Sequence, residues 1–163
     1  MTRSLPAHFR IRRLRVDDYD KGYMKLLAQL TIVGNVTKEA FNQRFNFMKQ
    51  HDYMYYPIVI EDTQCATIVA AGTVFIEHKF IHGLSKVAHM EDVVTHRDYR
   101  GQYLGVIIMQ ALKAIGKYTG CYKVILDCAD KNVAFYERAV GMQVKENQMV
   151  YYYDEPERPK PRL

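Results

Sequence analysis

The sequence predicts an α/β domain in which a mixed, mostly antiparallel β-sheet is flanked by helices, in the order β-α-α-β-β-β-α-β-α-β. Two patterns support this. Residues 86–95 alternate apolar and polar side chains as a strand does, whereas residues 104–118 carry apolar side chains at helical spacing. With 163 residues, 48% of them apolar, the chain is long enough for one core. We expect a single domain over residues 1–153 and a flexible, proline-rich tail over residues 154–163.

The first third of the chain is predicted to form one strand and two helices. Residues 9–14 alternate like a short strand, and residues 17–30 carry an apolar stripe at helical spacing, capped by one of the two aspartates at their start. After a turn at residues 31–36, Thr37 opens a second helix. The two helices would cover one face of the sheet.

The middle of the chain is predicted to be a run of strands. Residues 57–62 and 65–78 are rich in β-branched side chains and are expected to form a hairpin. A connection at residues 79–85 leads to the strand at residues 86–95.

The last part of the chain alternates helix and strand. The helix at residues 104–118 would stop at Gly120, a typical residue just beyond a helix. Residues 122–128 have a continuous apolar middle, which predicts a buried interior strand. A short helix at residues 132–140 and a final strand at residues 142–153 complete the order.

Charge and cysteine content limit the partners. The net charge of +5, from 23 basic and 18 acidic residues, favours anionic partners. The basic residues are scattered, and the arginines within residues 10–15 are expected on a solvated face, so nucleic acid is not an expected partner. Cys65, Cys121 and Cys128 have no metal-ligand spacing, and we expect them reduced, in the core, with no metal bound. Without an apolar leader or spanning run, we expect a cytoplasmic protein with no membrane insertion.

One stretch points to chemistry. A strand ending with the carboxylates Glu91 and Asp92 is followed by the turn at residues 100–105 and then by a helix. Unpaired N–H groups at a helix N-terminus bind phosphate, so the turn predicts an anion site, although an ordinary strand-to-helix turn has the same pattern. On an alternating strand the two carboxylates point to opposite faces, so only one lines the cleft. The competing interpretation of that one is a pair with an arginine at a sheet edge.

The turn resembles the cofactor loop Q/R-x-x-G-x-G/A of the GCN5-related N-acetyltransferase (GNAT) superfamily, with Arg100 and Gly105 at its ends and Tyr103 where a middle glycine is common. The segments HMEDVV, RGQYLG, GCYKVILDC and KNVAFYERAVG, in this order and spacing, resemble more closely the glucosamine-6-phosphate N-acetyltransferase family of UDP-N-acetylglucosamine biosynthesis. LTIVG and EHKFIHG extend the resemblance. It weakens at residues 151–153, three tyrosines where that family often carries an arginine that helps to hold the sugar phosphate.

The resemblance implies direct transfer of an acetyl group from acetyl-coenzyme A to the amine of glucosamine 6-phosphate. It implies that Glu91 faces the amine and helps to accept its proton, that the Asp127 carbonyl orients the amine, and that Tyr136 protonates the leaving thiolate. In a partly buried site the pKa of Glu91 would rise toward neutrality. Asp127 as a helix cap and Tyr136 as core filling remain alternatives. A covalent route through Cys128 is not expected, since no paired histidine is recognisable.

The resemblance also implies two sets of binding residues and a homodimer that shares residues between its two sites, with the tyrosine-rich final strand at the interface. The acetyl-coenzyme A set is Val93, Val94, Thr95, Arg100, Gly101, Gln102, Tyr103, Leu104, Gly105, Asn132 and Tyr136. The glucosamine 6-phosphate set is Thr31, Lys79, His82, Glu91, Asp92, Tyr122 and Lys123. Two other functions stay open: an acetyltransferase of this fold for a protein amine or another small amine, and a non-catalytic coenzyme A-binding module.

Overall fold

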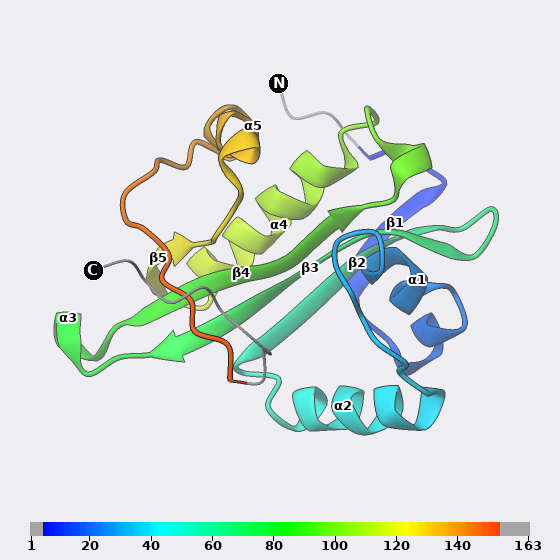
Figure 1. The fold of residues 1–163 in the computed structure, drawn as a ribbon, viewed down its shortest axis with the longest axis horizontal. Helices are drawn as coiled ribbons and strands as arrows, with labels where there is room; N and C mark the ends of the chain where they lie inside the picture. The colour runs from blue at the N-terminus through cyan, green and yellow to red at the C-terminus, as the bar shows by residue number, and fades with distance from the viewer. Residues whose placement is uncertain (1–4, 154–163) are drawn as a thin grey trace.

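Five strands form one mixed sheet in the order β1-β2-β3-β4-β5 in the computed structural model, which describes residues 5–153 (Figure 1). Neighbouring strands are antiparallel except β4 and β5, which are parallel. The strands are β1 (Phe9–Arg13), β2 (Tyr55–Asp62), β3 (Thr67–His78), β4 (Lys86–Thr95) and β5 (Cys121–Ile125). The predicted fold class, a mostly antiparallel sheet flanked by helices, is confirmed.

The helices are short except for three. They are η1 (Val16–Tyr19), α1 (Tyr23–Leu27), α2 (Lys38–Gln50), α3 (Ile81–Leu84), η2 (Arg97–Tyr99), α4 (Leu104–Tyr118) and α5 (Asp130–Val140). The bounds of β4 and α4 are those that periodicity predicted. Thr37 accepts a hydrogen bond from the Ala40 N–H and caps α2, and Gly120, with φ +77°, follows the end of α4 as expected.

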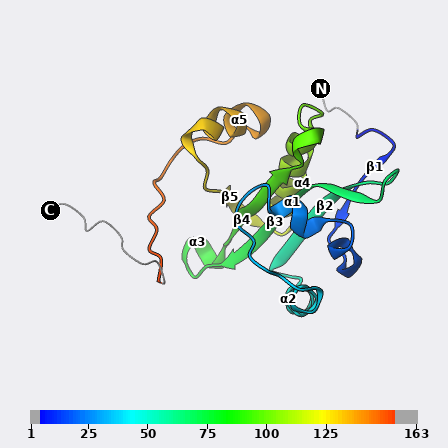
Figure 2. The ribbon, with the colours of Figure 1, turned by 45° about the vertical axis from the view of Figure 1, so that its right-hand side comes forward.

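The core has two halves, one on each face of the sheet. The α4 face packs Leu104, Ile108 and Leu112 against strand residues such as Ile60. The opposite face packs α1 and α2 against Val59 and its neighbours. Adjacent residues of a strand point to opposite faces, which is why Val59 and Ile60 belong to different halves. The prediction that the first two helices cover one face is confirmed (Figures 1 and 2).

The predicted helix over residues 17–30 is wrong as a single element. Gly22 has φ +85°, in the left-handed region, and separates η1 from α1. The expected aspartate cap is found at the start of η1, where Asp18 accepts a hydrogen bond from the Arg15 N–H, whereas Gly22 is the N-cap of α1. Asp18 is fully buried and also accepts hydrogen bonds from Arg12, whose side chain is only 8% exposed. The expectation of a solvated arginine face therefore fails at Arg12.

The prediction for the C-terminal part is also wrong in two respects. Residues 142–153 form no strand in the described chain and run beside the body as an extended segment (Figure 2). Without that neighbour, β5 is an edge strand, and Tyr122 and Ile125 are exposed instead of buried. The expected tail at residues 154–163 lies outside the described residues, and the extent of the domain stays a prediction.

Among residues 5–153, none of the helices is long and apolar enough to cross a membrane. No three histidine, cysteine or acidic side chains of these residues are grouped so as to hold a metal ion. The three cysteines are free thiols; Cys65 and Cys128 are exposed and Cys121 is partly exposed. The expectation that the cysteines are core residues is wrong for Cys65 and Cys128, whereas Cys121 packs against the α4-face core.

Candidate active site

A β-bulge lies in β4 at the predicted carboxylates. Thr73 pairs with Glu91 and Ala71 with Val94, so Asp92 and Val93 both lie opposite Gly72. Asp92 has φ +53°, which interrupts the regular alternation of the strand. The prediction that Glu91 and Asp92 occupy opposite faces of a regular strand is therefore wrong. A bulge leaves strand N–H groups out of the ladder, where they can bind another acceptor.

The surroundings of the bulge raise the pKa of both carboxyls. Burial raises the pKa of Glu91, and the charges of Asp92 and Asp127 raise it further against the opposing effect of His89. Burial also raises the pKa of Asp92. The predicted direction for Glu91 is confirmed. Among residues 5–153 no ion pair joins Glu91 to an arginine, so the edge-pair interpretation finds no support.

The parallel pairing of β4 with β5 ends at His89 and Ile125, whereas β4 itself continues to Thr95. Asp127 lies just beyond β5, and its charge acts on Glu91 from across this opening. Ala129, not Asp127, is the N-cap of α5, so the helix-cap alternative is wrong. The Asp127 carboxylate accepts a hydrogen bond from the Gln148 amide, with Nε2 and Oδ2 2.8 Å apart.

A pocket of about 690 Å³ lies at the N-terminus of α4, between the segment 95–106 and α5. Tyr103, with φ +64°, is the N-cap of α4 and makes no side-chain capping hydrogen bond. A Cβ added at Gly105 would lie 3.2 Å from Thr95 Oγ1 and 3.7 Å from the Phe135 ring, so a larger residue would crowd the pocket. Of the predicted cofactor residues, Thr95, Arg100, Gly101, Tyr103, Leu104 and Gly105 line it, and Val93, Val94, Gln102 and Asn132 do not.

Sequence reasoning missed the α5 side of this pocket. Lys131, Phe135 and Arg138 line it, and their spacing of four and then three residues places them on one helical face. That spacing was visible in the sequence. With Arg100, the pocket has three cationic side chains around the start of a helix, which suits a ligand carrying several phosphate groups.

Tyr136 lies on α5 and lines a second pocket of about 570 Å³ together with Asp127 and Cys128. Burial raises the pKa of its hydroxyl, with a smaller effect from Cys128. Its ring also packs against the α4-face core, so Tyr136 both fills part of the core and lines the pocket. The structure thus brings Tyr136 and Asp127 to one pocket.

The predicted substrate residues fall into separate places. The rings of His82 and Tyr122 are 4.6 Å apart, and Lys123 Nζ lies 5.7 Å from the Tyr122 ring. Lys79 pairs with Glu77. Thr31 is exposed on the segment between α1 and α2.

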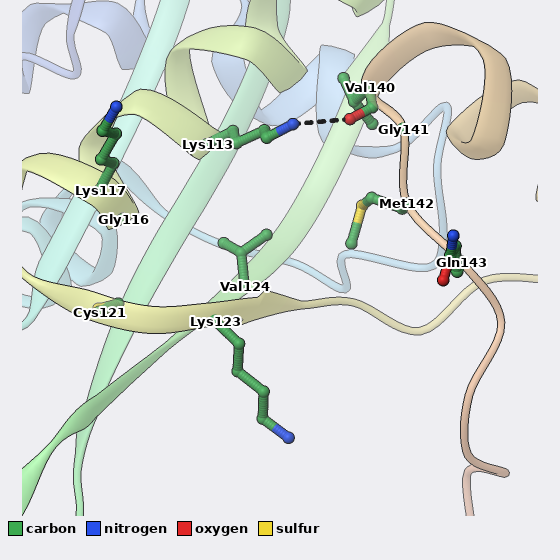
Figure 3. Close-up of a pocket in the computed structure, with 10 residues that line it drawn as sticks. All are labelled: Lys113, Gly116, Lys117, Cys121, Lys123, Val124, Val140, Gly141, Met142 and Gln143. Atoms are coloured by element: carbon green, nitrogen blue, oxygen red, sulfur yellow. Dashed lines mark hydrogen bonds between the residues drawn. The ribbon is translucent and has the colours of Figure 1, made fainter. Parts of the chain in front are cut away.

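A third pocket, of about 300 Å³, lies between the C-terminal half of α4, β5 and the chain after α5 (Figure 3). Lys113 Nζ donates to the Val140 carbonyl there, at 2.8 Å, and so binds the C-terminus of α5. Lys123 points to the other side of β5 from Val124 (Figure 3). This pocket shares Lys123, Val124, Met142 and Gln143 with the second pocket, and neither pocket is lined by the bulge carboxylates.

Comparison with known proteins gives consistent results. A model of the acetyltransferase (GNAT) family matches residues 11–142. The chain is 45% identical to glucosamine 6-phosphate N-acetyltransferase 1 of Dictyostelium discoideum, over 89% of this chain and 91% of that protein. It is 42% identical to the glucosamine 6-phosphate N-acetyltransferase of Arabidopsis thaliana, over 90% and 97%. The crystal structure of the Arabidopsis enzyme matches with a TM-score of 0.87, covering 90% of this chain and 99% of that one. A Trypanosoma brucei acetyltransferase matches with a TM-score of 0.82 at 30% identity, over 89% and 99%.

Proposed function

We propose, because this chain belongs to the acetyltransferase (GNAT) family, that it transfers the acetyl group of acetyl-coenzyme A to the amine of glucosamine 6-phosphate, giving N-acetylglucosamine 6-phosphate and coenzyme A. The observation that carries the proposal is the opening between β4 and β5. There the bulge carboxylate Glu91 and Asp127 lie close enough to interact, beside the pocket that holds Tyr136. Acetyl-coenzyme A supplies the acetyl group as a thioester.

The pocket at the start of α4 is the proposed seat for the coenzyme. Its N–H groups and the cations Arg100, Lys131 and Arg138 favour a pyrophosphate. Gly105 leaves the space in which a ligand approaches the backbone closely. No metal is part of the proposed chemistry.

Glu91 is the proposed acceptor of the amine proton. A free carboxylate is a weak base near neutral pH, and the raised pKa of Glu91 improves its match to an ammonium group. The Asp127 carbonyl is proposed to orient the amine once it has lost its proton. Direct attack is preferred over a cysteine route because partial desolvation and the charges of Asp130 and Asp127 raise the pKa of the Cys128 thiol.

The bulge in β4 and Tyr136 on α5 are proposed to assist the two remaining steps, stabilisation of the thioester oxygen and protonation of the leaving thiolate. The bulge N–H groups near Val93 are proposed to donate to the thioester oxygen as negative charge develops on it. Tyr136, whose raised pKa keeps the hydroxyl protonated at neutral pH, is proposed to give its proton to the leaving thiolate.

We also propose a cytoplasmic homodimer. Large apolar side chains are exposed near the β5 edge and on the final segment, among them Phe80 (95%), Tyr118 (91%) and Met149 (92%). Because β5 has an unpaired edge and residues 142–153 form no strand in the single chain, the final segment of one copy can lie against the other. The tyrosines at 151–153 suit such an interface. The free thiols agree with a reducing compartment.

The first experiment compares glucosamine 6-phosphate with unphosphorylated glucosamine by the release of coenzyme A thiol from acetyl-coenzyme A. Lys79 and Lys123 are the proposed phosphate ligands, and losing charge-assisted contacts to both should lower kcat/KM by about 100-fold or more. Equal, feeble rates with both sugars would move the search to another amine. Binding of coenzyme A without turnover of either sugar would favour the non-catalytic module.

If the protein turns over substrate, two variants test whether Glu91 and Tyr136 are the proton-transfer groups. Glu91→Gln and Tyr136→Phe should each lower kcat by about 100-fold, the range typical of a lost proton-transfer group. Tyr53→Phe is the matched control, because Tyr53 lies on the exposed turn between α2 and β2. Activity of Tyr136→Phe equal to that of the control would remove Tyr136 from the mechanism.

A further inference from the structure

A row of charged side chains lies on the sheet face that carries α1 and α2. Phe75 pairs with His89 and Thr73 with Glu91, and directly paired residues share a face. Glu77 and Glu91, each two residues from a member of those pairs, lie on this same face. We call Lys79, Glu77, His89 and Glu91 the polar row. It runs from the end of β3 to the bulge.

Glu77 is shared by two cationic partners. One carboxylate oxygen pairs with Lys79 Nζ, and the other lies 2.9 Å from His89 Nε2. The exposed fractions of the three side chains are 30% for Lys79, 35% for Glu77 and 28% for His89. Lys79, and then His89, lower the pKa of Glu77. This carboxylate divides one negative charge between the two partners.

His89 acts in turn on Glu91. Two residues along a strand correspond to roughly 7 Å, a distance that one water molecule spans. The His89 charge lowers the pKa of Glu91 against the effects of burial, Asp92 and Asp127. The protonation states of His89 and Glu91 are therefore coupled. The Phe75 ring, with its centroid 5.9 Å from that of His89, packs beside the imidazole.

A phosphate dianion would redistribute this charge. It carries twice the charge of the Glu77 carboxylate and competes with it for Lys79. Lys123 pairs in register with Val87, two residues from His89, and therefore lies on the same face as His89. It offers the phosphate a second cation. Once Lys79 has turned to the phosphate, Glu77 acts on His89 alone and stabilises the protonated imidazole.

We propose that Lys79, Glu77 and His89 form a relay through which binding of the sugar phosphate promotes loss of the proton from the sugar amine; this rests on the proposed function. The ammonium group gives one proton to Glu91, and Glu91 passes it through water to His89. In the net reaction the sugar ammonium becomes a free amine and the neutral imidazole of His89 becomes an imidazolium. The imidazolium later releases the proton to solvent. Glu77 and His89 are positioning residues that act through Glu91.

The titratable groups that act on His89 or on its partner Glu91 come from three segments. A variant that tests one of these groups must leave the others unchanged. The groups are Glu77 and Lys79 from β3 and the residue after it, Glu91 and Asp92 from β4, and Lys123 and Asp127 from β5 and the residues after it. Tyr55 on β2 reaches His89 only through the Phe75 ring.

The direct test follows the His89 ring by NMR over a pH titration, with the signal assigned from His89→Gln. Glucose 6-phosphate is the probe, because it carries the phosphate and has no amine, and glucose is the control ligand. Saturating glucose 6-phosphate should move the titration midpoint of His89 upward, and glucose should not. In Glu77→Gln the upward shift should disappear. No shift in the unmodified protein, or an equal shift in Glu77→Gln, would overturn the relay.

Kinetics give an independent readout. Glu77→Gln replaces the ion pair with Lys79 by a weaker, uncharged hydrogen bond, so KM for glucosamine 6-phosphate should stay the same or fall. At the same time kcat should fall about 10-fold and its acid limb should move to lower pH. A raised KM with unchanged kcat would mean that Glu77 only positions Lys79, and would reject the relay. Asp20→Asn, which removes the exposed partner of Lys38, is the matched control. Absence of turnover in the unmodified protein would count against the proposed function, and the NMR titration would still decide the relay.

Discussion

Two ionic clusters in this molecule are built on the same plan, a carboxylate shared by two cations, and differ in burial. In the first, Glu61 pairs with Arg12 and Lys21, and Arg12 also holds Asp18. The exposed fractions there are 8% for Arg12, 10% for Glu61 and 0% for Asp18. In the polar row, Glu77 pairs with Lys79 and His89 at 28–35% exposure.

The difference in burial determines which of the two clusters can exchange its ionic partners. Arg12 binds Asp18 through two parallel hydrogen bonds of 2.7 Å, and breaking them would leave the fully buried Asp18 with Lys21, 3.8 Å away, as its cationic partner. Lys79 and His89 each make one contact to Glu77, within reach of water. The first cluster therefore fixes β1, η1 and β2 together, whereas the second can respond to a ligand.

The largest expected effect is on the buried cluster. Asp18→Asn keeps the shape of the side chain but leaves Arg12 short of a negative charge, which should lower the free energy of unfolding by about 3 kcal/mol. Urea denaturation with a two-state fit measures this. Asp20→Asn, at an exposed pair with Lys38, should leave the denaturation midpoint unchanged. Equal behaviour of the two variants would break the distinction between the clusters.

The buried cluster also shows where sequence reasoning stops. The arginines of residues 10–15 form a series that is typical of a solvated strand face, and nothing local distinguishes Arg12 from the others. Its partner Glu61 lies 49 residues away and meets it only through β1–β2 pairing. By contrast, β4 and α4 were predicted within their true bounds, because alternation and helical spacing are local properties of the sequence.

The candidate site, like the fold, was predicted in part from the sequence. Motif resemblance pointed to Glu91, Asp127 and Tyr136, and the structure brings Asp127 near Glu91 and into one pocket with Tyr136. The bulge at Asp92 was not foreseen, since an extra residue in a strand leaves no trace in an apolar pattern. The final strand failed for another reason: in the single chain residues 142–153 do not pair with the open edge of β5, and a segment without a paired neighbour forms no strand.

Lowering the pH should reduce the contribution of Glu61 in the buried cluster to the free energy of unfolding. Burial raises the pKa of Glu61, but hydrogen bonds from Lys21 and Arg12 outweigh it and leave the pKa below its ordinary value of 4.5. A lowered folded-state pKa stabilises the fold above pH 4.5, and that contribution is lost as the pH falls through the folded value. Glu61→Gln should therefore lose stability less steeply below pH 4.5 than the unmodified protein, by at most about 1.4 kcal/mol per pH unit. Parallel curves would show that Glu61 titrates alike in both states.

The smallest effect on stability is expected from Glu77→Gln. Its contacts are single and partly hydrated, and pairs of this kind contribute less than about 1 kcal/mol. The amide can still accept from Lys79 and bond to His89, so β3 and β4 should stay paired, and urea denaturation should give nearly the midpoint of the unmodified protein. The same substitution is expected to lower kcat, so stability and turnover should separate at Glu77. A loss of stability as large as that of Asp18→Asn would mean that Glu77 is structural, and any loss of turnover would then need no relay to explain it.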